Sequence, residues 1–330
     1  MTRIGLSFDG FYPTEVTLDI ARRGVAAGAT SLWMAEHLGY RDPMTSAMAL
    51  AGACPGVTVV PTAVSPYLHK PMPVAMAMAT LSEFNAGHVA LAVGTGNPMF
   101  LAESGLEIVK PLRAIREQTE ALRDLFAGQS VTREAMLFTL NNARLAFQPA
   151  GPIPIYFCPM KEQMLRLSGK IADGLCLSGG LSPGFVRQSL DIAEAGAREA
   201  GRDPATLHKA GYIYFLASGT SKGGYDTLKS KLAFLMRNLF IGDNIAHSGL
   251  PIDQEAIMDA ISRRDFDTAK SLVPDEAVEA FSITGTVEDC LAGISRYAAA
   301  GLDEVVLIMA GEAEEREIGY KVIRRFAETA

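Results

Sequence analysis

The sequence predicts a (β/α)8 (TIM) barrel, in which eight parallel strands alternate with helices. Two observations favour this fold. Short apolar runs alternate with helical patterns along most of the 330 residues, and such alternation is typical of a parallel sheet. The first strand is followed by Asp9-Gly10 without a complete glycine fingerprint, whereas an open doubly wound sheet usually carries one at this turn. The open sheet therefore remains as the alternative.

Four strands are expected in the first half of the chain, at residues 3–8, 30–34, 57–63 and 88–93. Helices separate them. One helix is expected over residues 14–27, because Gly28 is a typical C-terminal stop. Asp42 and Pro43 supply an N-cap and a first-turn proline for a helix that runs to about residue 53. A third helix is expected to end near Phe84.

Four more strands are expected in the second half, at residues 153–157, 174–177, 210–217 and 304–309. Apolar residues between 112 and 126 fall at helical spacing, and Gly128 closes that helix. A helix after Pro159 is expected to continue to about Ser168, and Ser182-Pro183 begins the next one. The eight strands together fit a closed barrel.

Two stretches interrupt this repeat. Residues 136–147 alternate like a β-ribbon, and residues 241–282 contain extra helices between the seventh and eighth strands. We interpret both as insertions on the barrel rim, near residues 129–150 and 241–282. The sequence shows no internal repeat and no low-complexity linker, so residues 1–330 are expected to form one domain.

The composition favours a globular cytoplasmic protein, with 48% hydrophobic and 20% charged residues. Apolar runs stay below the ~18 residues of a membrane span, and the first residues lack a signal-peptide pattern. The four cysteines form no C-x-x-C pair, which disfavours a zinc ribbon or dithiol site, and no metal is expected. The net charge of −7 without a basic tract argues against a nucleic-acid partner.

Active sites of such barrels lie at the carboxyl ends of the strands, so candidate residues are those that follow each strand. Ser7 and Asp9 come at the end of the first strand, and Glu36-His37 follows the second. A carboxylate beside an imidazole can relay a proton or polarise a bound ring. The alternative is that Glu36-His37 is a helix-cap pair at the rim.

Two later turns are candidates for binding a coenzyme. Gly94-Thr95-Gly96-Asn97 follows the fourth strand, and its glycines allow the backbone to approach a flat ring or a phosphate closely. Cys158, Met160 and Lys161 follow the fifth strand and lead into a helix, whose free N–H groups could bind phosphate beside the lysine. The alternatives are that residues 94–97 form an ordinary tight turn and that Lys161 is a solvated lysine.

Several segments resemble the luciferase-like flavin and deazaflavin oxidoreductases. They are His88 to Gly96 (HVALAVGTG), Ala77 to Leu81 (AMATL) and Ile153 to Gly174. The C-terminal segments around His247, Ala280 to Asp289 and Ala300 to Val305 are similar to methylenetetrahydromethanopterin reductases. The similarity covers essentially the whole chain. It implies a luciferase-like barrel that forms a homodimer or a larger homo-oligomer.

The resemblance also implies a flavin-type coenzyme, which is F420 in the deazaflavin branch, with FMN or NAD(P)H as alternatives. Its ring would lie against a bulge at Ala63-Val64, where the family often has a non-prolyl cis peptide. Residues 94–97 would border the ring, and residues 158–161 would match the phosphate loop. Glu36-His37 occupies the place of the family's acidic residue–His pair.

One position departs from the reductase pattern. The reductases carry a glutamate on the first strand that is thought to protonate the pterin, and Ser7 stands there in this sequence. Serine cannot replace a carboxylic acid at neutral pH. Asp9 lies two residues further on and could take over that role if its side chain points inward, with Glu36 sharing it. Either the acidic residue stands at another position in this sequence, or the substrate differs from that of the reductases.

The leading hypothesis is an oxidoreductase that transfers a hydride from reduced F420 to a methylene-tetrahydropterin, of methanopterin or folate type, or to a related small electrophile. Because the coenzyme carries the difficult chemistry, the enzyme would mainly hold donor and acceptor at reacting distance. A nicotinamide donor with a folate-type substrate is a variant of this hypothesis. The rivals are an FMN-dependent monooxygenase and a non-catalytic flavin-binding barrel.

Overall fold

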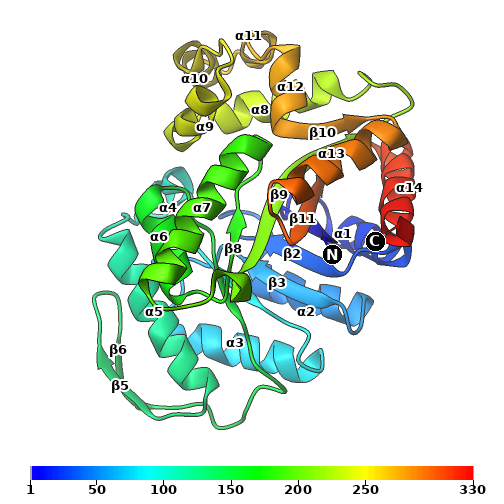
Figure 1. Cartoon of the computed structure of the whole chain (residues 1–330). Coiled ribbons are helices and arrows are strands. Elements are labelled where there is room, and N and C mark those ends of the chain that lie inside the picture. Colours follow the sequence, from blue (N-terminus) through cyan, green and yellow to red (C-terminus); the bar gives the residue numbers. More distant parts are fainter. Residues whose placement is uncertain (1, 330) are drawn as a thin grey trace.

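The computed structural model describes residues 2–329 and shows parallel strands surrounded by helices (Figure 1). The barrel strands are β1 (Arg3–Phe8), β2 (Ser31–Ala35), β3 (Thr58–Thr62), β4 (Leu91–Val93), β7 (Ile155–Phe157), β8 (Gly174–Leu177), β9 (His208–Ala217) and β11 (Glu304–Met309). They lie in the order β3-β2-β1-β11-β9-β8-β7-β4. Parallel bridges of Val59 with Val89 and of Val64 with Val93 join the two ends of this sheet. The predicted (β/α)8 barrel is therefore confirmed.

Helices cover the outside of the barrel. They are α1 (Thr14–Ala27), α2 (Pro43–Ala53), α3 (Pro71–Phe84), α4 (Pro98–Glu103), α5 (Pro111–Phe126), α6 (Glu162–Ile171), α7 (Pro183–Glu199), α8 (Tyr225–Met236), α13 (Val287–Ala299) and α14 (Ala313–Thr329). The side chains of Asp42 and Ser182 cap α2 and α7, as predicted. Gly28 ends α1 with a φ of 116°. None of the helices within residues 2–329 is long and apolar enough to cross a membrane.

Helix α6 begins after Lys161, as predicted, but ends later than predicted. It begins at Glu162 because Lys161 keeps an extended backbone, and it runs three residues past Ser168, to Ile171. Its end packs closely against α7, since a Cβ on Gly169 would lie 1.8 Å from the carbonyl oxygen of Ala193. That contact buries the last turn and stabilises it.

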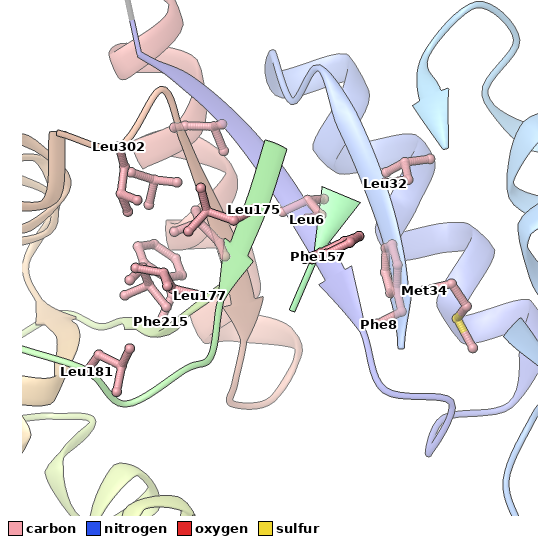
Figure 2. Packing of buried hydrophobic residues seen from close by; sticks show 14 of the residues in the cluster. Leu6, Phe8, Leu32, Met34, Phe157, Leu175, Leu177, Leu181, Phe215 and Leu302 are labelled. Atoms are coloured by element: carbon pink, nitrogen blue, oxygen red, sulfur yellow. The ribbon is translucent and has the colours of Figure 1, made fainter. Parts of the chain in front are cut away.

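Apolar side chains on the outer face of the strands form the main core. Leu6, Phe8, Leu32, Phe157 and Phe215 are at most 6% exposed and point from the strands toward the helices (Figure 2). Alternation places the opposite set of residues inside the barrel. That inner cluster includes Trp33, Val60, Ala92, Cys176 and Val306. Both faces of the sheet are buried, which explains the nearly continuous apolar runs in the strands.

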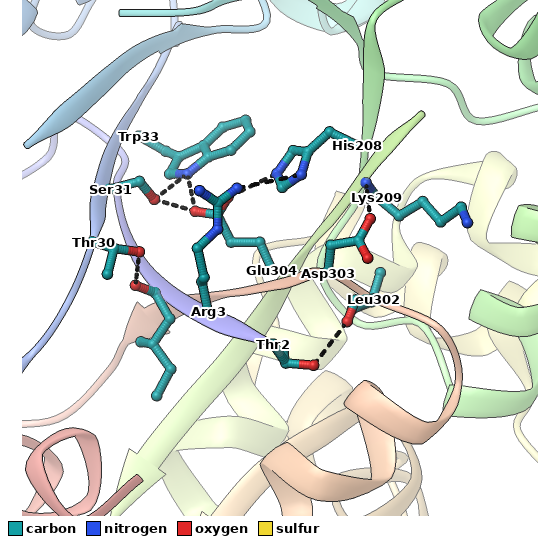
Figure 3. Close-up of polar contacts among 11 residues, drawn as sticks. Thr2, Arg3, Thr30, Ser31, Trp33, His208, Lys209, Leu302, Asp303 and Glu304 are labelled. Atoms are coloured by element: carbon teal, nitrogen blue, oxygen red, sulfur yellow. Dashed lines mark hydrogen bonds and ion pairs between the residues drawn. The ribbon is translucent and has the colours of Figure 1, made fainter. Parts of the chain in front are cut away.

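The amino end of the barrel is closed by a buried carboxylate, Glu304, whose side chain is 3% exposed. It accepts hydrogen bonds from Ser31, from Trp33 Nε1 at 3.0 Å and from His208 Nε2 at 2.8 Å (Figure 3). Burial opposes ionisation, but these donors outweigh it and lower the pKa of Glu304. A cavity of about 220 Å³ lies beside this cluster, at the end opposite to the predicted site.

Two insertions interrupt the repeat, as the sequence predicts. The ribbon expected at residues 136–147 is a hairpin of β5 (Val131–Glu134) and β6 (Thr139–Ala143). Its first strand therefore lies before the predicted range. The hairpin lies along α5 in the outer layer and not on the rim (Figure 1), because Arg133 forms ion pairs with Glu120 and Asp124 of α5. The expectation of a single domain stays a prediction.

The second insertion contains α9 (Gly242–Ser248), α10 (Gln254–Ser262), α11 (Phe266–Ser271) and α12 (Asp275–Phe281). With α8 these helices gather beyond one end of the barrel (Figure 1). The insertion starts after β9 and returns through a short strand that the sequence did not predict, β10 (Ser282–Gly285), which pairs with β9. It therefore belongs to the end where the strands terminate, which we call the mouth.

Candidate active site

Glu36 connects three neighbouring strand ends at the mouth. One of its carboxylate oxygens accepts the backbone N–H of Ser65 at 3.1 Å, and the Ser65 hydroxyl donates to the carbonyl oxygen of Thr95 at 3.0 Å. Glu36 follows β2, Ser65 lies just beyond β3, and Thr95 lies just beyond β4. This chain of hydrogen bonds therefore holds the predicted glycine turn in place.

The partner of Glu36 is His69, which the sequence analysis did not single out. The second carboxylate oxygen of Glu36 pairs with His69 Nε2, and the Glu36 side chain is 7% exposed. The hydrogen bond to Glu36 raises the pKa of His69 against the opposing effect of burial. Both oxygens of Glu36 are thus engaged within the protein, one with Ser65 and one with His69.

His37 is bound instead to the backbone of Asp9. Its Nδ1 lies 3.0 Å from the Asp9 carbonyl oxygen, and because a carbonyl only accepts, Nδ1 carries the proton and Nε2 keeps a lone pair. Burial lowers the pKa of His37 below its ordinary value of about 6.5, although the Asp9 carbonyl and nearby carboxylates oppose the shift. At neutral pH the imidazole is therefore uncharged and able to accept a proton.

Aromatic side chains surround His37 at the mouth. The Phe11 ring lies 5.1 Å from the imidazole and 4.4 Å from the Tyr40 ring, and Phe100 meets the imidazole edge-on at 5.9 Å. Phe11 and Tyr40 are 45% and 52% exposed. Exposed aromatic rings at a site entrance are suited to contact a planar ligand.

Ser7 and Asp9 occupy different surroundings, although alternation predicts the same face for both. Ser7 lies within β1, and its hydroxyl is near the Tyr212 phenol inside the barrel. Asp9 lies beyond the strand and accepts the backbone N–H of Phe11 at 3.0 Å. The negative charge of Asp9 acts on Tyr214 of β9. Burial, and after it the charge of Asp9, raises the pKa of Tyr214 to about 12.

Tyr212 is a further polar group at this end of the barrel interior. Its hydroxyl is buried and has no hydrogen-bond partner within residues 2–329, while Ser7 and Thr62 lie close enough to affect its pKa. Burial raises that pKa, so the phenol stays neutral and can donate a hydrogen bond. The alternation of residues 210–217 could have identified Tyr212 and Tyr214 as a pair on one face.

The two predicted coenzyme-binding turns share one cavity. It has a volume of about 200 Å³ and lies between the ends of β4 and β7 and the first turns of α5 and α6. Its lining includes Gly94, Thr95, Cys158, Met160 and Lys161. The structure therefore brings together five of the predicted residues from segments more than sixty positions apart.

Small residues meet at the strand ends beside this cavity. A Cβ on Gly94 would lie 2.8 Å from the Ala63 Cβ and 3.2 Å from the Cys158 Cβ, so these three strand ends pack directly together. Burial raises the pKa of the Cys158 thiol to about 12, which makes it a neutral packing group. A thiolate is the reactive form of cysteine, so this thiol is inert at neutral pH.

The remaining residues of the two turns have partners of their own. Gly96 has a φ of 83°, and Asn97 caps α4 through the N–H of Met99. Lys161 Nζ lies 2.6 Å from Asp243 of α9. Both partners of that pair are more than half exposed, so it contributes little stability and a bound phosphate can compete with Asp243 for the lysine.

The expected cis peptide at Ala63-Val64 is absent, since all peptide bonds among residues 2–329 are trans. Val64 N donates to the Ala92 carbonyl at 2.9 Å, and Gly94 N donates to the Val64 carbonyl at 3.3 Å. This pairing with the β4 segment keeps the chain extended through Val64. Also within residues 2–329, no three His, Cys, Asp or Glu side chains are placed to hold a metal ion.

Comparison with known proteins agrees with this barrel fold. The family model described as luciferase-like monooxygenase matches residues 12–304. The chain belongs to this family. Within the luciferase-like family, 5,10-methylenetetrahydromethanopterin reductases are among its most similar relatives. That of Methanolobus tindarius is 28% identical over 300 residues, covering 90% of this chain and 91% of the relative. That of Archaeoglobus fulgidus is 25% identical, covering 90% and 89%.

Solved structures of the family show the same fold. The coenzyme F420 dependent tetrahydromethanopterin reductase from Methanopyrus kandleri superposes with a TM-score of 0.86 at 22% identity, covering 99% of this chain and 97% of that one. An F420-dependent glucose-6-phosphate dehydrogenase from Nakamurella multipartita is a further relative, 28% identical over 59% of this chain and 61% of its own length.

Proposed function

We propose that this protein is an F420-dependent oxidoreductase that transfers a hydride from the reduced coenzyme to a methylene-tetrahydropterin or a related electrophile. The observation that carries the proposal is the similarity to methylenetetrahydromethanopterin reductases over 90% of the chain. The cavity that joins Gly94 and Thr95 to Cys158 and Lys161 supports it, because it lies at the mouth, where barrels of this kind bind their ligands.

The residues at the mouth fit such a coenzyme. The directly packed Ala63, Gly94 and Cys158 leave a wall of small side chains against which a flat ring can lie. Gly96 and Asn97 would border the ring, and Val64 would lie beside it. Lys161, at the start of α6, would hold a phosphate of the coenzyme once it exchanges Asp243 for that anion.

The bound coenzyme supplies the hydride, so the chain itself has to position the acceptor and manage protons. His37 is neutral, keeps a lone pair on Nε2 and lies among the aromatic rings of the entrance, where it would accept or polarise a proton on the acceptor. Asp9 stabilises positive charge that develops there. Glu36 fixes the turn at Thr95 through Ser65 and so positions the coenzyme ring. The roles of His37, Asp9 and Glu36 are part of the proposal.

The serine at position 7 affects which substrate we propose for the protein. With serine in place of a carboxylic acid, protonation of a pterin depends on Asp9 or on a hydroxyl such as that of Tyr212. The proposal therefore includes related small electrophiles beside the pterin. It also includes assembly into a homodimer or larger homo-oligomer, which the light scattering of the purified protein would test.

Anaerobic binding and turnover test the proposed function. The purified protein is titrated with F420, FMN, NADH and NADPH, and each reduced coenzyme is then mixed with methylenetetrahydromethanopterin or methylenetetrahydrofolate without oxygen. We expect tight binding of F420 and its anaerobic oxidation by one of the pterins. Turnover that requires FMN and oxygen would indicate a monooxygenase, and coenzyme binding without any turnover would indicate a non-catalytic flavin-binding barrel.

A further inference from the structure

Arg237, which follows α8, is a half-buried cation whose positive charge lacks a close partner. Its Nε is buried and makes no hydrogen bond within residues 2–329. The guanidinium lies over the Phe234 ring, 3.5 Å from the ring centre. Burial lowers the pKa of Arg237, and Glu103 opposes this only from a distance, without a hydrogen bond. Partly buried charges in proteins are usually paired, as Arg187 is with Asp191 and Glu194.

The neighbours of Arg237 place it over the mouth. The groups whose charges act on it are Glu103, Tyr214 and Tyr40. Tyr214 belongs to β9, Tyr40 follows β2, and Glu103 is the last residue of α4, which follows β4. Leu235, two residues before Arg237, lies against Gly180 in the loop after β8. This contact places the end of α8, and with it Arg237, at the mouth.

We propose that Arg237 binds an anionic group, a carboxylate or a phosphate, on the hydride acceptor. The inference rests on the proposed function. It adds that the substrate is an anion and that Arg237, between α8 and the second insertion, holds it. Stacking on Phe234 fixes the plane of the guanidinium, which leaves its N–H groups for a bidentate contact with a planar or tetrahedral oxyanion.

The acceptor is favoured over the coenzyme as the source of this anion. The cavity proposed for the coenzyme has its own cation, Lys161, and Arg237 is not among the residues that line it. Arg237 instead shares Tyr214 as a neighbour with Asp9, on the side where His37 and the exposed aromatic rings Phe11 and Tyr40 form the entrance.

The test compares Arg237→Gln with Arg263→Gln. Arg263 is an exposed arginine of the nearby second insertion and pairs with Asp259. The KM for the acceptor and kcat are measured with saturating reduced F420, the Kd for F420 is measured separately, and thermal unfolding verifies that both variants are folded. We expect Arg237→Gln to raise the KM for the acceptor at least tenfold, with kcat within threefold and the Kd for F420 unchanged. Arg237→Lys should recover part of the loss, and Arg263→Gln should match the wild type.

Titrating the proteins without coenzyme with inorganic phosphate and with glutarate provides a second readout that does not depend on turnover. We expect at least one of the two anions to bind the wild type and to bind Arg237→Gln at least tenfold more weakly. A weakened Kd for F420 with an unchanged acceptor KM would assign the anion to the coenzyme and overturn the proposal, as would failure of both anions to bind. If the wild type binds these anions through Arg237 but does not oxidise reduced F420, the proposed function fails and the anion site stands.

Discussion

At the scale of single residues, the site depends on groups whose protonation is set by their surroundings. His37 is kept neutral by burial, and Tyr212 is kept neutral with an unused hydroxyl. The residue types and their positions could be predicted for His37, Glu36 and Asp9, because each follows a recognisable strand. Their pairing could not, since His69 lies 33 positions from Glu36 and only the loop after β3 brings it there.

The pH dependence of turnover tests the state of His37. If the uncharged imidazole is needed, kcat/KM should fall on the acid side with an apparent pKa below 6.5, because burial disfavours the charged form. His37→Gln should lower kcat at least tenfold and remove this acid limb. An acid limb at or above pH 6.5, or one that persists in the variant, would show that another group is responsible.

The Tyr212 hydroxyl gives a second prediction for single residues. Tyr212→Phe removes a hydrogen-bond donor beside Ser7 without changing the shape of the interior. We expect kcat to fall at least tenfold while the Kd for F420 and the melting temperature stay near those of the wild type. Tyr156→Phe is the matched control, because Tyr156 is a barrel-lining tyrosine at the opposite end. Equal kcat for Tyr212→Phe and the control would exclude a role in the reaction.

At the scale of elements, most strands begin and end within a few residues of the prediction, because apolar alternation and cap residues are local signals. β4 is shorter than predicted, covering Leu91–Val93, since only Val89 of the preceding residues bridges β3. Helix α4 and strand β10 were missed. Each is four to six residues long and depends on its neighbours, through the Asn97 cap and through pairing with β9, more than on its own sequence.

The ion pair between α6 and α9 leads to a prediction about coenzyme affinity. Lys161 is paired with Asp243, so the carboxylate competes with a coenzyme phosphate for the same ammonium. Lys161→Ala should weaken binding of F420 more than binding of its dephospho form, whereas Asp243→Asn should strengthen binding of F420. Titrations at fixed ionic strength measure both effects. Equal losses for the two forms in Lys161→Ala would mean that the lysine is only a surface residue.

The glycine turn is best tested at a neighbouring residue. Gly96→Val is unsuitable, because a φ of 83° and a Leu101 methyl 3.2 Å from the new Cβ would strain the backbone itself. Ser65→Ala instead removes only the hydroxyl that supports Thr95 and the N–H of Tyr67. We expect it to weaken F420 binding severalfold in a direct titration, with Ser295→Ala on α13 as a neutral control. An unchanged Kd for F420 would show that the glycine turn does not border the coenzyme ring.

At the scale of the whole molecule, the barrel has a separate stabilising cluster at its amino end. Glu304 is buried and accepts hydrogen bonds from Ser31, Trp33 and His208 (Figure 3), at the end of the barrel opposite to the mouth. Glu304→Gln should lower the free energy of unfolding by about 3 kcal/mol, measured by urea denaturation, with little change in the Kd for F420. A variant as stable as the wild type would show that the cluster does not stabilise the barrel.

The lowered pKa of Glu304 also sets the direction of a pH effect on stability. Its contribution is present above the ordinary carboxyl pKa of about 4.5 and is lost as the pH falls through the lower folded-state value. The difference in unfolding free energy between the wild type and Glu304→Gln should therefore shrink as the pH falls below 4.5. A difference that stays constant down to pH 3 would contradict this account of the cluster.

The central claim is direct hydride transfer from F420 at the mouth of this barrel, and an isotope label tests it most directly. F420 is reduced with deuterium at the reducing carbon of its ring and mixed anaerobically with the protein and methylenetetrahydromethanopterin, and the product is analysed by mass spectrometry. The account predicts one deuterium per product molecule, with none incorporated when unlabelled coenzyme is used in deuterated water. A reduced product without coenzyme-derived deuterium, or no product from any tested pterin or electrophile, would contradict it.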